Sequence, residues 1–249
     1  MWHNPRLLNI AAGFLTALGL VLLTFTGSAL VLRSTLFPMR EVTVRGALAH
    51  TTHGEIERVG QGAVAGNFFG VDLAGVRGAF ERLPWVRRVD VRRVWPDRLE
   101  VTLEEHVALA RWDGGGAVNT FGERFAAQAD AQLPLFAAPA GSEAEVTRRY
   151  RLFAERLASL DLHVERVLLS PRYAWQLSLA NGLQLVLGRD AADDAVEARL
   201  ARFVAAYPST VGRIAGKHDY VDLRYTNGFA LRMPGAERAA GSDSSGRKG

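Results

Sequence analysis

The sequence predicts an α+β protein that follows a single N-terminal transmembrane helix. Three observations support this prediction. Residues 10–32 contain no Asp, Glu, Lys, Arg or His, residues 37–106 mix strand and helix patterns, and residues 107–234 carry mostly short alternating strands. We therefore expect a membrane helix, a small β-α-α-β-β domain, and a larger, mainly antiparallel β domain with two helices.

The apolar run at 10–32 is long enough to cross a bilayer. At about 1.5 Å per residue a helix of this length spans roughly 34 Å, slightly more than a hydrocarbon core of about 30 Å. A secretory signal has a shorter apolar core, although the small residues Gly27-Ser28-Ala29 leave cleavage open. We expect a retained signal-anchor, with residues 1–9 in the cytoplasm, because a long following domain is translocated largely regardless of flanking charge.

Composition narrows the classes of function. The chain of 249 residues has no cysteine, which excludes disulfides, thiolate metal sites and cysteine nucleophiles. The net charge of +4 is spread along the sequence and is compatible with anionic lipid nearby. Basic residues do not form a stripe with interleaved aromatics, so we do not expect nucleic-acid binding.

The first domain is expected to open with a strand at 41–46, where polar and apolar residues alternate up to a glycine. A weak helix is expected at 54–65, and a better one follows Asp72, which can cap it, and stops at Pro84. Two strands complete the domain, one around Val89 and Val91 and one from Arg98 to Glu104, separated by a turn at Trp95-Pro96-Asp97.

The second domain begins with short strand candidates at 108–112 and 117–124 on either side of a glycine loop. The segment 125–140 is rich in Ala and Pro and is interpreted as a surface connection. Ser142 and Glu145 have the spacing of a capping box, which predicts a helix that starts there.

A hairpin follows in the second half of this domain. Leucines alternate with other residues on both sides of the turn Asn181-Gly182, which is typical of a tight hairpin. Asp190 is expected to cap a second helix, and Asp193 and Asp194 are placed in its first turn.

Two final strands are predicted, at 220–225 and 229–233, around a turn at 226–228. A terminal hairpin often lies at the edge of a sheet, where unpaired backbone groups can accept a strand from another chain. The apolar anchors for such a partner would be Tyr220, Tyr225, Phe229 and Met233. The alternative is that these side chains only pack the core, as we expect of Val221 and Leu223. The tail at 235–249 is too polar to fold.

No catalytic, cofactor-binding or metal-binding residue is predicted. A nucleophile elbow and a phosphate-binding loop are both absent. The nearest approach to a metal site is His50 and His53 beside Glu55, which an ordinary polar loop explains better. Glu104 and Glu105 are consecutive in a strand and point to opposite faces, so they do not form a carboxylate pair.

One basic feature is left open. The pairs Arg87-Arg88 and Arg92-Arg93 flank one predicted strand. They could form a basic face for a partner, or they could be the solvated side of the strand.

Several specific motifs carry a resemblance to a known family. They are, in the first domain, Phe37-Pro38-Met39-Arg40-Glu41-Val42-Thr43-Val44-Arg45-Gly46, Leu83-Pro84-Trp85-Val86 and Trp95-Pro96-Asp97-Arg98-Leu99, and in the second, Trp175-Gln176-Leu177-Ser178-Leu179, Leu187-Gly188-Arg189, Arg202-Phe203-Val204 and Tyr220-Val221-Asp222-Leu223-Arg224-Tyr225. The chain resembles the bacterial cell division family FtsQ (DivIB in other bacteria) over nearly all of residues 10–234.

The resemblance implies a POTRA domain at 37–106 and an FtsQ-type β domain at 107–234. It implies a single-pass protein of the cytoplasmic (inner) membrane at the division septum, with both domains in the periplasm. It also implies a scaffold without catalysis, cofactor or small-molecule substrate. The implied partners are FtsB and, with it, FtsL, and other divisome proteins could bind through the POTRA domain. A POTRA-containing chaperone or transport module is the alternative.

In that family the partner adds a strand to the last strand of the β domain. The positions of this sequence that match the contact motif are Arg224, Tyr225, Asn227, Gly228 and Met233, with Phe229 as an expected anchor and Arg172 as a nearby basic contact. Two departures are visible. Asn227 stands where many relatives have Ser, and Met233 stands where an aromatic residue is common, so side-chain specificity is expected to differ.

Overall fold

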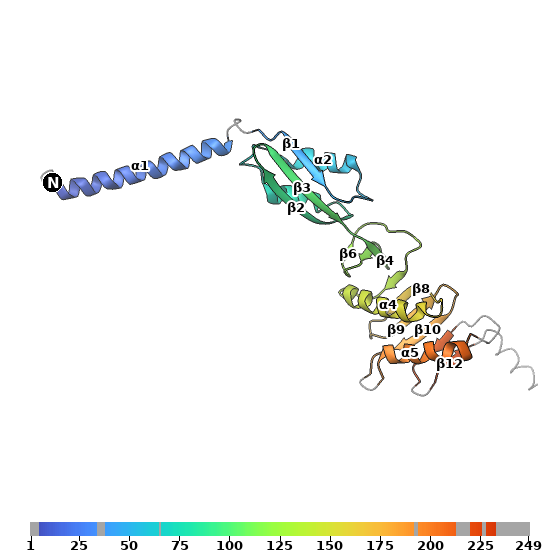
Figure 1. Cartoon of the computed structure of the whole chain (residues 1–249). Coiled ribbons are helices and arrows are strands. Elements are labelled where there is room, and N and C mark those ends of the chain that lie inside the picture. Colours follow the sequence, from blue (N-terminus) through green and yellow to red (C-terminus); the bar gives the residue numbers. More distant parts are fainter. Residues whose placement is uncertain are drawn as a thin grey trace, which may run out of the picture. The chain divides into compact units, whose positions relative to one another are not determined.

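The computed structural model describes residues 5–33, 38–64, 66–191, 194–212, 220–225 and 228–232. Two compact units divide the chain between Glu105 and His106, and each is described by itself (Figure 1). The predicted tail at 235–249, the turn residues 226–227 and Met233 lie outside the described residues.

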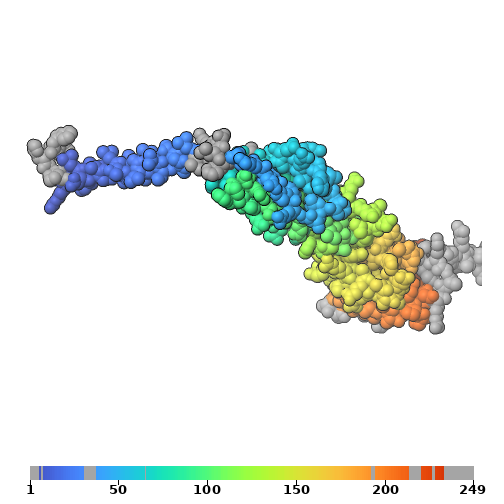
Figure 2. Space-filling model, turned by 45° about the horizontal axis from the view of Figure 1, so that its top comes forward, coloured from blue at the N-terminus to red at the C-terminus, as the bar shows by residue number. Residues whose placement is uncertain are grey.

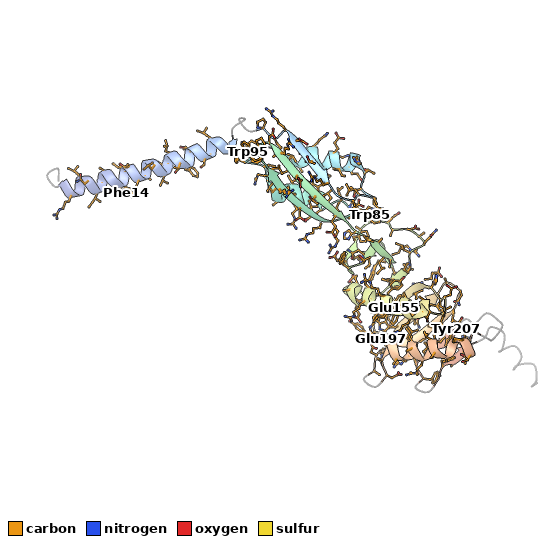
Figure 3. All side chains as sticks on the ribbon, in the orientation of Figure 1. Phe14, Trp85, Trp95, Glu155, Glu197 and Tyr207 are labelled. Carbon is orange, nitrogen blue, oxygen red and sulfur yellow. The ribbon has the colours of Figure 1, made fainter. Side chains whose placement is uncertain are left out.

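Helix α1 (Pro5–Arg33) contains the apolar run. Its segment Leu8–Leu30 has a mean hydropathy of 2.0 and is not buried by the rest of the described chain. Phe14 projects outward from it (Figure 3). The hydroxyl of Thr16 donates to the carbonyl of Ala12 at 2.8 Å, and other hydroxyls of the helix do the same, which suits a helix in hydrocarbon because its polar groups find partners within it.

After α1, the first unit has the predicted order β-α-α-β-β. Its elements are β1 (Glu41–Arg45), α2 (His53–Ala63), α3 (Leu73–Phe80), β2 (Val86–Val94) and β3 (Arg98–Glu105). The sheet order is β1-β3-β2, with β1 parallel and β2 antiparallel to β3. Both helices contribute to one core with the sheet, whose most buried residues include Val76, Phe80, Val89, Leu99 and Val101.

Side-chain caps set both helix starts in this unit. Asp72 accepts a hydrogen bond from the Ala74 N–H at 3.0 Å, as predicted. The sequence prediction missed the cap of α2, where Thr52 and Glu55 form a capping box.

Arg87, Arg92 and Arg93 of β2 have partners within the unit, whereas Arg88 is exposed. Arg87 donates to Glu104 at 2.8 Å, and Arg92 donates to Glu100 at 2.6 Å. Arg93 donates to the carbonyl of Val71 at 2.8 Å. These contacts favour the interpretation of a surface strand over that of a free basic face.

Glu105, the last residue of β3, holds the loop that follows β1. Its carboxylate accepts hydrogen bonds from the backbone N–H groups of Ala49 at 2.8 Å and Thr51 at 2.7 Å. Next to it, His50 stacks on Trp85 with ring centroids 3.7 Å apart. Burial alone would raise the pKa of Glu105, but the hydrogen bonds from the N–H groups of Ala49, His50 and Thr51 hold it at about 2.

We predict that Glu105→Gln destabilises the first unit, by up to about 3 kcal/mol. Because the folded-state pKa is depressed, this contribution is present above the unfolded pKa near 4.5 and is lost as pH falls toward 2. Urea denaturation at about pH 7 and about pH 3 measures it.

The matched control is Glu104→Gln, because Glu104 is half-exposed and pairs only with Arg87 at the surface, where such pairs contribute about 0–1 kcal/mol. Equal destabilisation by the two substitutions, or a loss of stability for Glu105→Gln that does not change with pH, would contradict the assignment.

The second unit contains a sheet of nine strands among the described residues. Its strands are β4 (Ala108–Trp112), β5 (Ala117–Asn119), β6 (Arg124–Phe125), β7 (Leu135–Ala137), β8 (Val164–Leu169), β9 (Trp175–Leu179), β10 (Gln184–Gly188), β11 (Tyr220–Asp222) and β12 (Ala230–Arg232). The order is β12-β11-β10-β9-β8-β7-β4-β5-β6. Only the pairs β4–β7, β7–β8 and β10–β11 are parallel, so the sheet is mainly antiparallel, as predicted.

Two helices, α4 (Glu143–Ala158) and α5 (Val196–Ala206), pack side by side on one face of this sheet (Figure 1). A short 3-10 turn, η1 (Tyr207–Ser209), follows α5. Phe153 of α4 meets the Trp175 ring edge-on at 5.7 Å. Arg149 joins the helices through ion pairs to Glu197 and, at 2.6 Å, to Asp190. Helix α5 packs against β10, the strand that pairs with β11.

Several local predictions were wrong. The supposed surface connection at 125–140 contains β7, a strand in the interior of the sheet whose Phe136 is fully buried. Ser142 makes no side-chain cap and donates to the Pro139 carbonyl instead. Asp194 precedes α5 rather than entering its first turn, whereas Asp190 does accept a hydrogen bond from the Val196 N–H at 2.9 Å.

The predicted last strands are also shorter than expected. The strand predicted at 220–225 ends at Asp222, and within 229–233 the described strand is Ala230–Arg232. After Leu223 the chain leaves the ladder, and the Arg224 N–H donates to the side-chain carboxylate of Asp222 rather than to a neighbouring strand.

Candidate partner-binding edge

Strand β12 lies at one end of the nine-stranded sheet. It pairs antiparallel with β11, with Tyr220 opposite Arg232 and Asp222 opposite Ala230. No further strand pairs with it among the described residues. An outer edge of this kind offers backbone donors and acceptors to another chain.

The ladder indicates which backbone groups face outward. The Leu223 N–H donates to the Val186 carbonyl of β10 at 2.9 Å. Because successive residues of a strand direct their backbone groups to opposite sides, Asp222 faces β12 and its partner Ala230 faces β11. The N–H and C=O of Leu231 therefore point away from the sheet, at the open edge.

An ion pair fixes the chain where β11 ends. Asp222 is buried, and its carboxylate accepts hydrogen bonds from the Arg224 guanidinium at 2.6 and 2.9 Å and from the Arg224 N–H at 3.0 Å. These hydrogen bonds lower the pKa of Asp222, and the carboxylate raises the pKa of Arg224. Tyr220 donates to the same carboxylate at 3.3 Å. Arg224 is thus held by its own chain, with its side chain still largely exposed.

Gly188, at the end of β10, lies beneath this ion pair. Its φ of +75° is in the left-handed region, and a Cβ atom there would stand 2.9 Å from Cγ of Arg224 and 3.2 Å from a guanidinium nitrogen of Arg199. The position therefore needs glycine for two reasons, the backbone conformation and the close approach of two arginines.

Arg199 of α5 is a buried arginine with a full set of partners. It donates to Asp194 at 2.7 Å and to the carbonyls of Leu187 and Arg189 at 2.6 and 2.8 Å. Its hydrogen bonds lower the pKa of Asp194. The guanidinium connects the start of α5 to the end of β10, and so stiffens the support on which Arg224 rests.

The strand directions bring the predicted contact residues to one end of the sheet. Arg172 lies exposed in the turn before β9, while Arg224 and Tyr225 follow β11, and Gly228 and Phe229 precede β12. The starts of β9 and β12 lie beside the ends of β10 and β11, as the registers show. Asn227 and Met233, which were also predicted, lie outside the described residues.

The aromatic residues at this end have different roles. Tyr225 is 58% exposed, whereas Phe229 is half-buried and meets Phe203 edge-on with centroids 6.1 Å apart. Phe203 in turn contacts Tyr207 with ring centroids 5.4 Å apart. Tyr207 follows α5 and is labelled in Figure 3. A hollow of about 470 Å³ is lined by Arg202, Phe203, Leu223, Gly228 and Phe229 among others. Part of the segment that contains α5 and the last two strands, in orange, lies at the surface of this unit (Figure 2).

Sequence reasoning missed Asp222, Gly188 and the pair of Arg199 with Asp194. A signal existed for Asp222, because an acidic residue inside an apolar strand needs a partner when it is buried. For the buried arginine the sequence carries no comparable signal, since a charged residue near the start of a helix is usually exposed and the carbonyls that Arg199 bonds belong to the preceding strand and loop.

The described residues contain no cluster of three or more His, Cys, Asp or Glu side chains that could hold a metal ion. His50, the earlier metal candidate, stacks on Trp85 and lies 3.5 Å from Glu105. The strongly held carboxylates have arginine or backbone partners. The fold and this edge thus define a chain with one apolar N-terminal helix, a small α+β domain and a β domain with an open strand.

Comparison with known proteins agrees with this class. The family model "POTRA domain, FtsQ-type" matches residues 37–106, and "Cell division protein FtsQ/DivIB, C-terminal" matches residues 110–224. A cell division protein FtsQ of Burkholderia pseudomallei is 45% identical, over 94% of this chain and 95% of that protein. Those of Nitrosospira multiformis (39%; 93% and 99%) and Bordetella pertussis (37%; 94% and 93%) are similar over nearly their whole lengths. The chain belongs to the FtsQ/DivIB family of bacterial cell division proteins.

We predict that Gly188→Ala destabilises the second unit and displaces Arg224, because the new methyl group enters the space of two arginine side chains. The expected loss is about 1–3 kcal/mol in urea denaturation.

Gly182→Ala is the matched control, since Gly182 also has a positive φ but would place no atom within 4 Å of its new Cβ. The steric argument fails if the two variants lose the same stability.

Proposed function

We propose that this protein is a non-enzymatic scaffold of the division machinery, held in the cytoplasmic membrane by α1. Its POTRA and β domains lie in the periplasm at the division septum, where they help to recruit and regulate septal peptidoglycan synthesis. Membership of the family and the exposed apolar helix support this proposal.

The proposed partner is FtsB, together with FtsL, and the proposed mode is strand addition to β12. The observation that carries this proposal is the open edge at β12, where the backbone groups of Leu231 face outward. A partner segment in extended conformation would continue the sheet beyond its last strand.

Backbone pairing to a strand of three residues contributes little to the free energy of binding. Each hydrogen bond contributes about 0.5–1.5 kcal/mol net, so side chains must add affinity. Tyr225 offers an exposed aromatic surface, and Arg172 and Arg224 offer cationic groups for an acidic or amide-rich partner. Asn227, Gly228, Phe229 and Met233 complete the proposed contact set.

The shared membrane supplies a further contribution. A partner with its own transmembrane helix moves in the same bilayer as α1, so its effective concentration at β12 exceeds its concentration in solution. A weak docking strand is sufficient under these conditions, and an isolated soluble domain is expected to bind the same partner less well.

If FtsB adds a strand to β12, Leu231→Pro is predicted to abolish its binding. Proline removes the outward N–H of Leu231 and leaves the pairing of Ala230 with Asp222 in place. The control is Leu231→Ala, which removes a similar amount of packing but keeps the N–H.

Affinity measured by biolayer interferometry on the full-length chain in detergent should fall much further for the proline variant than for the alanine variant. Equal affinities for the two variants would exclude strand addition at this position.

Tyr225→Ala is predicted to weaken FtsB binding by about 1–3 kcal/mol, as truncation of an exposed aromatic anchor does at a binding hot spot. The fold should stay intact, because the ring is exposed. Phe121→Ala is the control, since Phe121 is similarly exposed but lies between β5 and β6 at the other end of the sheet order. An unchanged affinity for Tyr225→Ala would remove this residue from the site.

The alternative of a POTRA-containing chaperone or transport module has less support. The FtsQ relatives are similar over both domains of the chain, not over the POTRA domain alone. Co-purification partners distinguish the two: divisome proteins support the scaffold, and exported client proteins support the chaperone.

A further inference from the structure

The first unit has an open edge of its own, at β1 (Glu41–Arg45). Strand β1 ends the sheet order β1-β3-β2. A single bridge between Pro38 and Asn67 precedes the strand. Along Glu41–Arg45 no strand pairs with its outer side among the described residues, so this edge also offers backbone groups to another chain.

The sequence of β1 is complementary to itself. It reads Glu41-Val42-Thr43-Val44-Arg45. When two copies pair antiparallel about Thr43, each Glu41 lies opposite an Arg45, each Val42 opposite a Val44, and Thr43 opposite itself. Opposite charges and β-branched pairs at directly facing positions stabilise antiparallel strands.

Other registers lose this complementarity. Parallel in-register pairing places Glu41 on Glu41 and Arg45 on Arg45, and like charges directly opposite are destabilising. An antiparallel shift by two residues places Thr43 opposite Glu41 or Arg45 and leaves charges without partners. Charged residues on an edge normally oppose pairing; here their order favours the antiparallel register centred on Thr43 over these alternatives.

The exposed face of the sheet already carries an alternating row of charge that a second copy would extend. Within the unit Glu41 lies 3.4 Å from Arg98 of β3, and Arg45 lies 3.6 Å from Glu100, which also pairs with Arg92. In the paired dimer, Arg45 of one copy would stand between its own Glu100 and Glu41 of the other. The row would then continue without a like-charge contact.

The opposite face has space for the second copy. Val42 and Val44 point to the core side, but both are only half-buried. Beside them lies a groove of about 640 Å³ between β1 and α2, whose lining includes Met39, Ile56 and Val64. The facing valines of a second copy would cover the apolar part of this groove, whose lining also includes Glu41, His53 and Glu57.

We propose that β1 is a self-association edge, and that its occupant is β1 of a second copy of this chain, related by a two-fold axis through Thr43. Such a contact is isologous and closes at a dimer. It joins two three-stranded sheets into one, and it is independent of the partner edge at β12.

The membrane anchor is compatible with this arrangement. The two-fold axis is perpendicular to the joined sheet. When this axis is normal to the bilayer, both β1 strands lie parallel to the membrane plane, and both anchors can enter the membrane on the same side of the dimer. The eight steps from Arg33 to Glu41 span at most about 28 Å when fully extended, which leaves both anchors room beside the dimer. Because both copies share one bilayer, a short interface is sufficient for association.

Disulfide trapping tests the axis directly, because the chain has no cysteine of its own. In Thr43→Cys the two new thiols face each other, with Cα atoms about 4.5–5.5 Å apart. Thr102→Cys is the control: Thr102 is exposed and lies opposite Arg45, but on the central strand β3. Full-length protein in vesicles should form several-fold more disulfide dimer with Thr43→Cys than with Thr102→Cys. Equal yields would overturn the proposal.

Charge exchange tests the register. In the Thr43→Cys background, Glu41→Arg places arginine opposite Arg45, and Arg45→Glu places glutamate opposite Glu41, so each variant alone should lose several-fold in dimer yield. A mixture of the two, with one chain tagged to identify the mixed dimer, restores both opposite-charge pairs and should recover the yield. Because both side chains are exposed, circular dichroism should show intact folds. A mixture that traps no more dimer than the separate variants would overturn the proposal.

A different occupant gives a different result. If Thr43→Cys in cells is trapped only with another envelope protein, and purified chains in vesicles form no dimer, β1 is a docking edge for that protein and not for a second copy. That outcome also overturns the proposal, and it leaves the function proposed for β12 unaffected.

Discussion

The backbone hydrogen-bond ladder of the second unit is the interaction on which the rest of the account depends. Among the described residues, β6 and β12 are the two outer strands of this sheet, and each of the seven strands between them pairs on both sides. A sheet cannot satisfy the outer groups of its own last strand. These groups are left either to water or to another chain, and the function proposed above gives them to a partner strand.

The charged groups near this edge support the edge rather than provide chemistry. Asp222 is held by Arg224, and Arg199 is held by Asp194 and by the carbonyls of Leu187 and Arg189. Each buried charge is therefore paired, as burial requires. The groups that remain exposed are the Tyr225 ring, the Arg172 and Arg224 side chains and the outward backbone N–H and C=O of Leu231. Groups of these kinds bind other proteins. The Glu105 carboxylate has the same structural role in the first unit, where it fixes a loop.

Much of this fold could be predicted from the sequence where the patterns are local. The charge-free run predicts α1, alternation predicts β3 and the β9–β10 hairpin, and Asp72 predicts the start of α3. β7 was missed because a strand of three residues beside prolines carries too little periodicity, and its position depends on pairing with β4 and β8. For the candidate site, the resemblance supplied the contact residues. The close approach of Gly188 to the side chains of Arg199 and Arg224 depends on how the strands pair, and no local sequence spacing predicts it.

The central claim is that a partner strand pairs with the outer side of β12. Amide hydrogen exchange at Leu231, measured on the full-length chain in detergent with and without an FtsB fragment, tests it most directly. The account predicts rapid exchange at Leu231 in the free chain and strong protection in the complex, while the amide of Val221, inside the sheet, is protected in both. If the complex forms and Leu231 exchanges as fast as in the free chain, the partner binds elsewhere and the claim is wrong.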